Sequence, residues 1–200
     1  MNDDRSNLSG VYSPVITPFY SDLSVDKKLL IRQCQWLLSQ SVGLAVFGTN
    51  SEANSLSVNE KIEILNALIE AGIDPKKTIP GVGCCALTDT IKLTQHAVKL
   101  GYFNVLMLPP FYYKDVSDDG LFDSYSKIIE TVDSDSLRIY LYHIPPIANV
   151  SISLNLIERL KNSYPKIIAG IKDSSGDWKN TLAMLNQGWP DFNIFAGSEV

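Results

Sequence analysis

The chain alternates over its whole length between short apolar runs and longer amphipathic stretches. The short runs are rich in Val, Ile, Phe and Tyr, which is typical of strands buried on both faces of a sheet. Strands that alternate with helices pair in parallel through right-handed crossovers, so the pattern favours the parallel α/β class. We predict strands at Val11–Thr17, Gly43–Gly48, Thr78–Val82, Asn104–Leu108, Arg138–Tyr142, Ile167–Lys172 and Phe192–Ala196.

The amphipathic stretches have apolar residues three and four positions apart, the spacing of one face of a helix. Ser57 is followed three residues later by Glu60, which predicts a capping box at the start of one helix. We predict helices at Asp26–Ser39, Ser57–Glu70, Thr88–Leu100, Ser117–Thr131, Ser153–Lys161 and Gly176–Asn186.

Two architectures fit this alternation: a closed (β/α)8 TIM barrel and an open doubly wound sheet. The open nucleotide-binding sheet would carry Gly-x-Gly-x-x-Gly after its first strand. The chain has Val15-Ile16-Thr17-Pro18-Phe19 at that place. A barrel also explains polar residues at the carboxyl ends of several strands. The sequence therefore favours the α/β barrel.

The predicted elements amount to about seven strands and six helices, and the seventh strand lies just before Ser198-Glu199-Val200. A whole barrel takes about 250 residues. We therefore expect residues 1–200 to form a single TIM-barrel domain that is truncated at its C-terminus relative to a full barrel. Because an open barrel exposes strand edges, we expect these residues alone to be aggregated or partly folded, and inactive.

Charge and composition narrow the choice of partners. The formal net charge is −5, and no run of Lys or Arg exceeds two residues, which disfavours a nucleic-acid partner. Residues 1–7 are polar and lack the apolar core of a secretory signal, and no apolar stretch approaches the roughly 20 residues that span a bilayer. Cys34, Cys84 and Cys85 are expected to be buried thiols, and their odd number suits a reducing, cytoplasmic compartment.

The segment from Ile167 to Asp177 is the most informative, because an apolar strand delivers Lys172 at its last position. In a barrel that position points into the mouth where active sites lie. Partial loss of water there disfavours the charged amine, and a neutral amine can attack a ketone to form an imine. The alternative is a solvated lysine at a strand end.

Tyr142 and His143 end another predicted strand. A phenol at this place could relay protons in imine chemistry. The alternative is a tyrosine whose ring packs and whose hydroxyl caps the core edge. We interpret His143 as a structural histidine rather than a base.

Two further strand ends carry polar or aromatic groups. The turn from Gly48 to Glu52 offers backbone N–H groups and hydroxyls that could hold a carboxylate. The aromatic cluster from Leu108 to Lys114 alone predicts packing. His96 and His143 are the only histidines and no ligand cluster has metal spacing, so neither a metal nor another cofactor is expected.

Taken together, these segments resemble the dihydrodipicolinate synthase / N-acetylneuraminate lyase family of class I, Schiff-base aldolases. The resemblance covers nearly all 200 residues, with the segments in the same order. It rests on Thr17-Pro18-Phe19, Gly48-Thr49-Asn50-Ser51-Glu52, Pro110-Phe111-Tyr112-Tyr113, Tyr142-His143-Ile144-Pro145, Gly170-Ile171-Lys172-Asp173-Ser174-Ser175-Gly176-Asp177 and Gly197.

The resemblance implies roles for individual residues. Lys172 is expected to form the imine with pyruvate or another 2-oxo acid, and Tyr142 to relay protons near it. Thr49 is expected to link Tyr142 to its partner, and Tyr112 is expected to be the tyrosine lent across a dimer interface. The substrate would be a 2-oxo acid together with an aldehyde, and the full-length form a homotetramer built as a dimer of dimers. The site expected to grip the pyruvate carboxylate comprises Gly48, Thr49 and Asn50.

The chain also departs from the family pattern. Asn50 and Ser51 replace the second threonine and the following glycine of Gly-Thr-Thr-Gly-Glu, and Ile147 stands where the synthases of lysine biosynthesis usually carry an arginine. An apolar side chain cannot bind a second carboxylate. The leading hypothesis is therefore a lyase or aldolase for another substrate. The alternatives are 4-hydroxy-tetrahydrodipicolinate synthase and an inactive truncated fragment.

Overall fold

The structure is a computed structural model that describes residues 8–198, so the polar residues 1–7 and the last two residues of Ser198-Glu199-Val200 lie outside it. The described residues divide into two compact units. We call residues 10–82 with 92–105 the N-terminal unit, and residues 8–9, 83–91 and 106–198 the C-terminal unit. Each unit is described by itself.

The N-terminal unit contains two short parallel strands and two long helices. β1 pairs with β2 in the register Tyr12↔Gly43. Asp26 and Ser57 cap the two helices, and the capping box between Ser57 and Glu60 is present as predicted. The elements are β1 (Tyr12–Pro14), α1 (Lys27–Ser39), β2 (Gly43–Ala45), the 3-10 helix η1 (Ala53–Ser55), α2 (Val58–Glu70) and the 3-10 helix η2 (Pro75–Lys77). Two further elements, α3 (Leu87–Lys99) and β3 (Asn104–Met107), have residues in both units.

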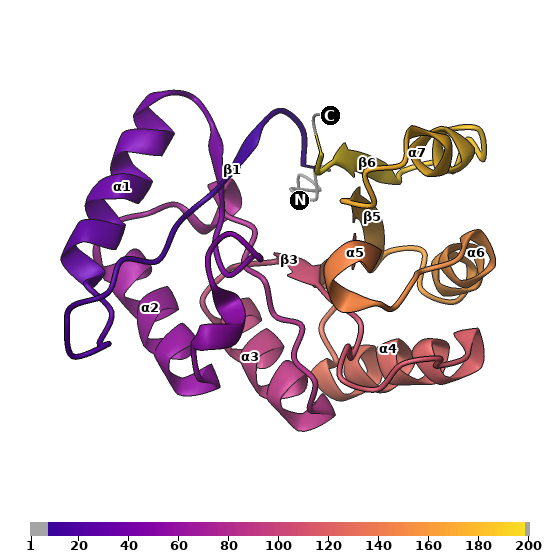
Figure 1. Ribbon diagram of the computed structural model, residues 1–200, viewed down its shortest axis with the longest axis horizontal. Coiled ribbons are helices and arrows are strands. Elements are labelled where there is room, and N and C mark those ends of the chain that lie inside the picture. The colour runs from indigo at the N-terminus through magenta and orange to yellow at the C-terminus, as the bar shows by residue number, and fades with distance from the viewer. Residues whose placement is uncertain (1–7, 199–200) are drawn as a thin grey trace. The chain divides into compact units, whose positions relative to one another are not determined.

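The C-terminal unit carries the strands β4, β5 and β6, which continue a sheet in the order β3-β4-β5-β6. β4 pairs in parallel with β5, and β5 with β6. In this unit α4 packs against α6, α6 against β5, and α7 against β6 (Figure 1). The carboxyl ends of neighbouring strands therefore meet at one edge of the sheet. The elements are α4 (Asp118–Val132), β4 (Arg138–His143), α5 (Pro145–Ala148), α6 (Leu154–Ser163), β5 (Ile168–Asp173), α7 (Trp178–Leu185) and β6 (Asn193–Ala196).

Gly170 allows the strands of this sheet to pack closely. A Cβ atom added there would lie 2.3 Å from the carbonyl oxygen of Asn193 and 2.8 Å from the ring of Tyr140. Leu8 is bonded to the same two residues: its N–H donates to the Tyr140 hydroxyl at 2.9 Å, and its carbonyl accepts from the Asn193 amide at 2.6 Å. The beginning of the chain is thus attached to β4 and β6.

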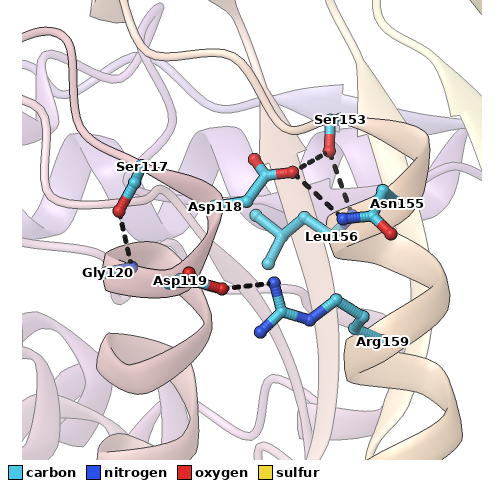
Figure 2. Close-up of polar contacts among 8 residues, drawn as sticks. All are labelled: Ser117, Asp118, Asp119, Gly120, Ser153, Asn155, Leu156 and Arg159. Carbon is cyan, nitrogen blue, oxygen red and sulfur yellow. Dashed lines mark hydrogen bonds and ion pairs between the residues drawn. The ribbon is translucent and has the colours of Figure 1, made fainter.

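The helices α4 and α6 are joined at their N-termini (Figure 2). Ser153, the N-cap of α6, donates from its Oγ to Asp118 at 2.5 Å and accepts from the N–H of Leu156 at 3.0 Å. Arg159 forms an ion pair with Asp119 at 2.8 Å. That pair is exposed, so it contributes at most about 1 kcal/mol, and the buried apolar faces hold the helices together.

The predicted third strand is wrong as a regular strand within residues 8–198. Ile79 and Gly81 do donate to the carbonyls of Leu44 and Val46, at 2.7 and 2.8 Å. The pairing nevertheless remains at the level of isolated bridges, and Pro80 has no N–H with which to extend a ladder. The described chain therefore has six strands rather than seven.

All six predicted helices are present, with ends within two residues of the expected positions. One helix of the described chain, α5, was not predicted. Pro145 and Pro146 begin it, because proline is tolerated in the first turn of a helix.

The prediction that all three cysteines are buried is wrong for Cys85, which is exposed, and for Cys84, which is half-buried. Both precede α3 in a loop, whereas Cys34 lies on the inner face of α1. None of the helices in the described part of the chain combines the length and apolar character that a membrane crossing requires.

Candidate active site

Lys172 and Tyr142 lie beside each other at the carboxyl ends of β5 and β4. The two residues are direct partners in the parallel register, so their side chains share one face of the sheet. The Lys172 Nζ lies 3.5 Å from the Tyr142 hydroxyl and 4.5 Å from the centroid of the tyrosine ring. Tyr142 is buried and Lys172 is half-buried. Each strand ends one residue later than predicted.

The contact between an amine and a phenol has chemical consequences. The amine, when uncharged, is a nucleophile for ketones, and the phenol can give or take the protons that imine formation requires. The π face of Tyr142 also attracts the ammonium form of Lys172 and so keeps the side chain at this place before reaction.

Asp173 holds the end of β5 from the opposite face of the strand. Its carboxylate accepts from the N–H of Ser175 at 3.0 Å, from Asn180 Nδ2 at 3.0 Å and from Thr181 Oγ1 at 2.7 Å. Burial works to raise the pKa of Asp173, but the hydrogen bonds from Thr181, Ser175 and Asn180 outweigh it and lower that pKa. A charged, buried carboxylate thus fixes the turn between Lys172 and α7.

His143 is buried beside Asp173, and its ring accepts a hydrogen bond from the backbone. Its Nδ1 accepts the N–H of Ile152 at 3.1 Å, which leaves the ring proton of the neutral form on Nε2. Burial lowers the pKa of His143, and the charge of Asp173 partly opposes this effect. These contacts agree with the interpretation of His143 as a structural histidine.

Gly197 lies against the side chain of Lys172. A Cβ atom at Gly197 would stand 2.8 Å from Lys172 Cε and 2.1 Å from the Oγ of Ser174. That Oγ is buried and makes no hydrogen bond. Because glycine has no side chain, position 197 leaves the space in which the Lys172 side chain lies.

Tyr112 and Tyr113 are on the segment after β3, in the C-terminal unit. Their side chains are 72% and 77% exposed, and the two rings meet edge to face with centroids 5.2 Å apart. The aromatic cluster does not pack into the core in the manner that its composition alone predicted.

The turn from Gly48 to Glu52 belongs to the N-terminal unit. The N–H groups of Ser51 and Glu52 donate to the carbonyls of Gly48 and Thr49, which closes the turn. Thr17 donates from its hydroxyl to the carbonyl of Ser51 at 2.6 Å, so the Thr17-Pro18-Phe19 motif supports this turn. Gly48 is buried, whereas the residues exposed at the tip are Thr49 and Asn50.

Sequence reasoning missed the part played by Asp173 and its two helical donors. Asn180 and Thr181 stand seven and eight residues later, and no pattern in the sequence marks them as partners of Asp173. Among residues 8–198 no three His, Cys, Asp or Glu side chains gather into a group that could hold a metal ion.

The fold and this site define a class: parallel α/β barrels that carry a lysine beside a tyrosine at adjacent strand ends. The model of the dihydrodipicolinate synthetase family matches residues 7–200, and the chain belongs to this family. The expected fold class, the (β/α)8 barrel, is confirmed by the solved structures that the chain matches.

Three related proteins illustrate the similarity. An uncharacterised DapA-like lyase from Chloroflexus aurantiacus is 37% identical over 192 residues, which are 95% of this chain and 63% of that protein. The structure of dihydrodipicolinate synthase from Agrobacterium tumefaciens is 35% identical, with a TM-score of 0.86 over 92% of this chain and 65% of that one. A prophage protein of the same family from E. coli K12, solved in complex with pyruvate, is 26% identical, with a TM-score of 0.84 over 92% and 62%. The chain thus spans less than two thirds of the length of these relatives.

Proposed function

We propose that the protein is a class I lyase or aldolase in which Lys172 forms a Schiff base with pyruvate or another 2-oxo acid. The observation that carries the proposal is the contact between Lys172 Nζ and the Tyr142 hydroxyl at adjacent strand ends. A lysine whose amine is only solvated would be surrounded by water, whereas the amine of Lys172 lies beside the hydroxyl of a buried tyrosine. The family membership of the chain supports the same reaction class.

The proposed reaction begins with attack of the uncharged Lys172 amine on the ketone carbon of the 2-oxo acid. Tyr142 passes one proton from the attacking nitrogen to the alkoxide oxygen, which gives a neutral carbinolamine. Tyr142 then donates its own proton to the new hydroxyl, which leaves as water, so that the protonated imine forms and Tyr142 regains a proton from solvent. The protonated imine then draws electrons from the neighbouring carbon, so that a C–C bond to an aldehyde is made or broken there.

The remaining assignments come from the family resemblance. We propose that Thr49 links Tyr142 to its partner, and that Tyr112 acts across a dimer interface in a dimer of dimers. Its high exposure agrees with a residue that serves a second copy. The carboxylate of the 2-oxo acid would be gripped by Gly48, Thr49 and Asn50.

Pyruvate is the proposed 2-oxo acid, supported by the relative that was solved with pyruvate bound. Ile147 is 62% exposed on α5 and offers no charge to an acceptor that carries a second carboxylate. We therefore place an aldehyde without that group ahead of the lysine-pathway acceptor. The similarity to a dihydrodipicolinate synthase favours 4-hydroxy-tetrahydrodipicolinate synthase as the second candidate.

Three wider assignments stay proposals. We propose that both units belong to one barrel domain, since the family match runs across them. The three free thiols support a reducing compartment such as the cytoplasm. An inactive fragment is the alternative to an enzyme, and the trapping experiment distinguishes the two.

The deciding experiment is borohydride reduction in the presence of pyruvate, followed by peptide mass mapping. We expect one pyruvate adduct, on Lys172. Lys172→Arg should abolish labelling while keeping the positive charge, because a guanidinium stays protonated and is a poor nucleophile. A label on another lysine, or no label, would refute the proposal. Lys179→Arg, an exposed lysine on α7, is the matched control.

A further inference from the structure

Lys114 joins two segments that follow neighbouring strands of the C-terminal unit. We call residues 109–117, which follow β3, the tyrosine loop, and residues 144–149, which follow β4, the α5 segment. The Lys114 ammonium donates to the carbonyl of Phe111 within the tyrosine loop. It also donates to the carbonyl of Ala148 in the α5 segment at 2.9 Å.

Each of these two contacts restrains a different part of the structure. The contact with Phe111 closes the backbone around Tyr112 and Tyr113, and Asp115 follows in the left-handed region with φ +56°. Ala148 is the last residue of α5, where a cation is favoured because the helix ends in unpaired carbonyls. Within residues 8–198, no other hydrogen bond connects the tyrosine loop to the α5 segment.

The connected segments carry two exposed residues that enter the proposed function. Tyr112 is on the tyrosine loop, and Ile147 is on the α5 segment, where it is 62% exposed. Lys172 is on β5 and, among the described residues, forms no hydrogen bond with Lys114. We therefore expect a change at Lys114 to alter how the two segments are placed, while β4 and β5 keep Lys172 and Tyr142 in register.

We propose that Lys114 is a positioning residue that holds the tyrosine loop and the α5 segment in one arrangement, and thereby sets how Ile147 meets the second substrate. The part about the second substrate rests on the proposed function. The connection between the two segments does not rest on it.

The first test is amide hydrogen exchange of the intact protein carrying Lys114→Met, which keeps the length of the side chain and removes its donors. We expect exchange to accelerate about fivefold or more in the tyrosine loop and in the α5 segment together. Lys114→Arg should restore slow exchange, because a guanidinium can donate to both carbonyls. Lys127→Met, an exposed lysine on α4, should change neither segment. Acceleration confined to the tyrosine loop would overturn the proposal.

The second test separates the two substrates. In Lys114→Met we expect the KM for the acceptor aldehyde to rise about tenfold, with the yield of pyruvate trapped on Lys172 unchanged. An unchanged KM, or an equal loss of trapping, would overturn the positioning role. If the unmodified protein traps no pyruvate, the proposed function fails, and the exchange experiment still decides whether Lys114 connects the segments.

Discussion

The Nζ of Lys172 lies 3.5 Å from the hydroxyl of Tyr142, and both residues occupy the same register position on adjacent parallel strands. Such a contact is maintained by the backbone of two strands, so it does not depend on a mobile loop. The amine and the phenol are therefore preorganised for proton exchange.

Removing the hydroxyl tests this pair. Tyr142→Phe keeps the ring that faces the Lys172 ammonium and removes the proton carrier. We expect the rate of pyruvate trapping on Lys172 to fall about 10²- to 10⁴-fold, with the unfolding midpoint little changed. Tyr164→Phe, which loses a hydrogen bond to Glu130, should trap at the normal rate. Rapid trapping by Tyr142→Phe would show that another group moves the proton.

A side chain at Gly197 should displace the reactive lysine. In Gly197→Ala the new Cβ would stand 2.8 Å from Lys172 Cε and 2.1 Å from Ser174 Oγ, closer than atoms can approach. We expect trapping to fall at least about tenfold, measured as the initial rate at saturating pyruvate. Gly120→Ala is the control, because its Cβ meets nothing closer than 3.5 Å and alanine favours the helix. A normal trapping rate in Gly197→Ala would show that the backbone after β6 can move aside without displacing Lys172.

The buried charge of Asp173 predicts a pH-dependent stability. The folded pKa of Asp173 lies below its ordinary value of 3.8, so its contribution to stability is present above that value and is lost as the pH falls through the folded pKa. At pH 7 we expect Asp173→Asn to lower the free energy of unfolding by about 1–3 kcal/mol. In urea titrations the difference from the unmodified protein should shrink below pH 3.8.

Asp135→Asn provides the comparison for Asp173→Asn, since Asp135 is exposed in the loop after α4. Its unfolding curve should follow that of the unmodified protein at each pH. A constant difference between Asp173→Asn and the unmodified protein down to pH 2 would indicate that packing, rather than charge, accounts for the loss.

Ile147 gives a prediction about the acceptor. We expect aspartate semialdehyde to be a poor acceptor, about ten- to a hundredfold below the preferred aldehyde in kcat/KM, because no charge at this position binds its carboxylate. Ile147→Arg should narrow that gap, and Ile147→Met should not. Efficient turnover of aspartate semialdehyde by the unmodified protein would favour the lysine-pathway synthase instead.

Local patterns in the sequence predicted local structure well. The Ser57–Glu60 capping box is present because its donors and acceptors lie within one turn of chain. Lys172 and Tyr142 were expected at strand ends, and their mutual contact follows from the parallel register. The strand predicted at Thr78–Val82 failed because apolar composition does not report backbone donors, and Pro80 lacks the backbone N–H.

Contacts that depend on tertiary packing could not be predicted. The two side-chain donors to Asp173 come from α7, whose approach depends on how that helix packs on β6. Lys114 and Ala148 are 34 positions apart in the sequence. Nothing in the local sequence distinguishes Lys114 from a lysine that makes no such contact. The space at Gly197 also becomes visible only once β6 lies beside β5.

The attachment of Leu8 to Tyr140 and Asn193 has a consequence for the order of events during synthesis. A ribosome releases the N-terminus first, but Asn193 is made 185 residues after Leu8. The carbonyl of Leu8 therefore cannot meet its partner until nearly all of these strands have been synthesised. Contacts of such long sequence separation slow folding and prolong exposure to aggregation. We expect this protein to depend on chaperones during translation more than a helical bundle of equal length does.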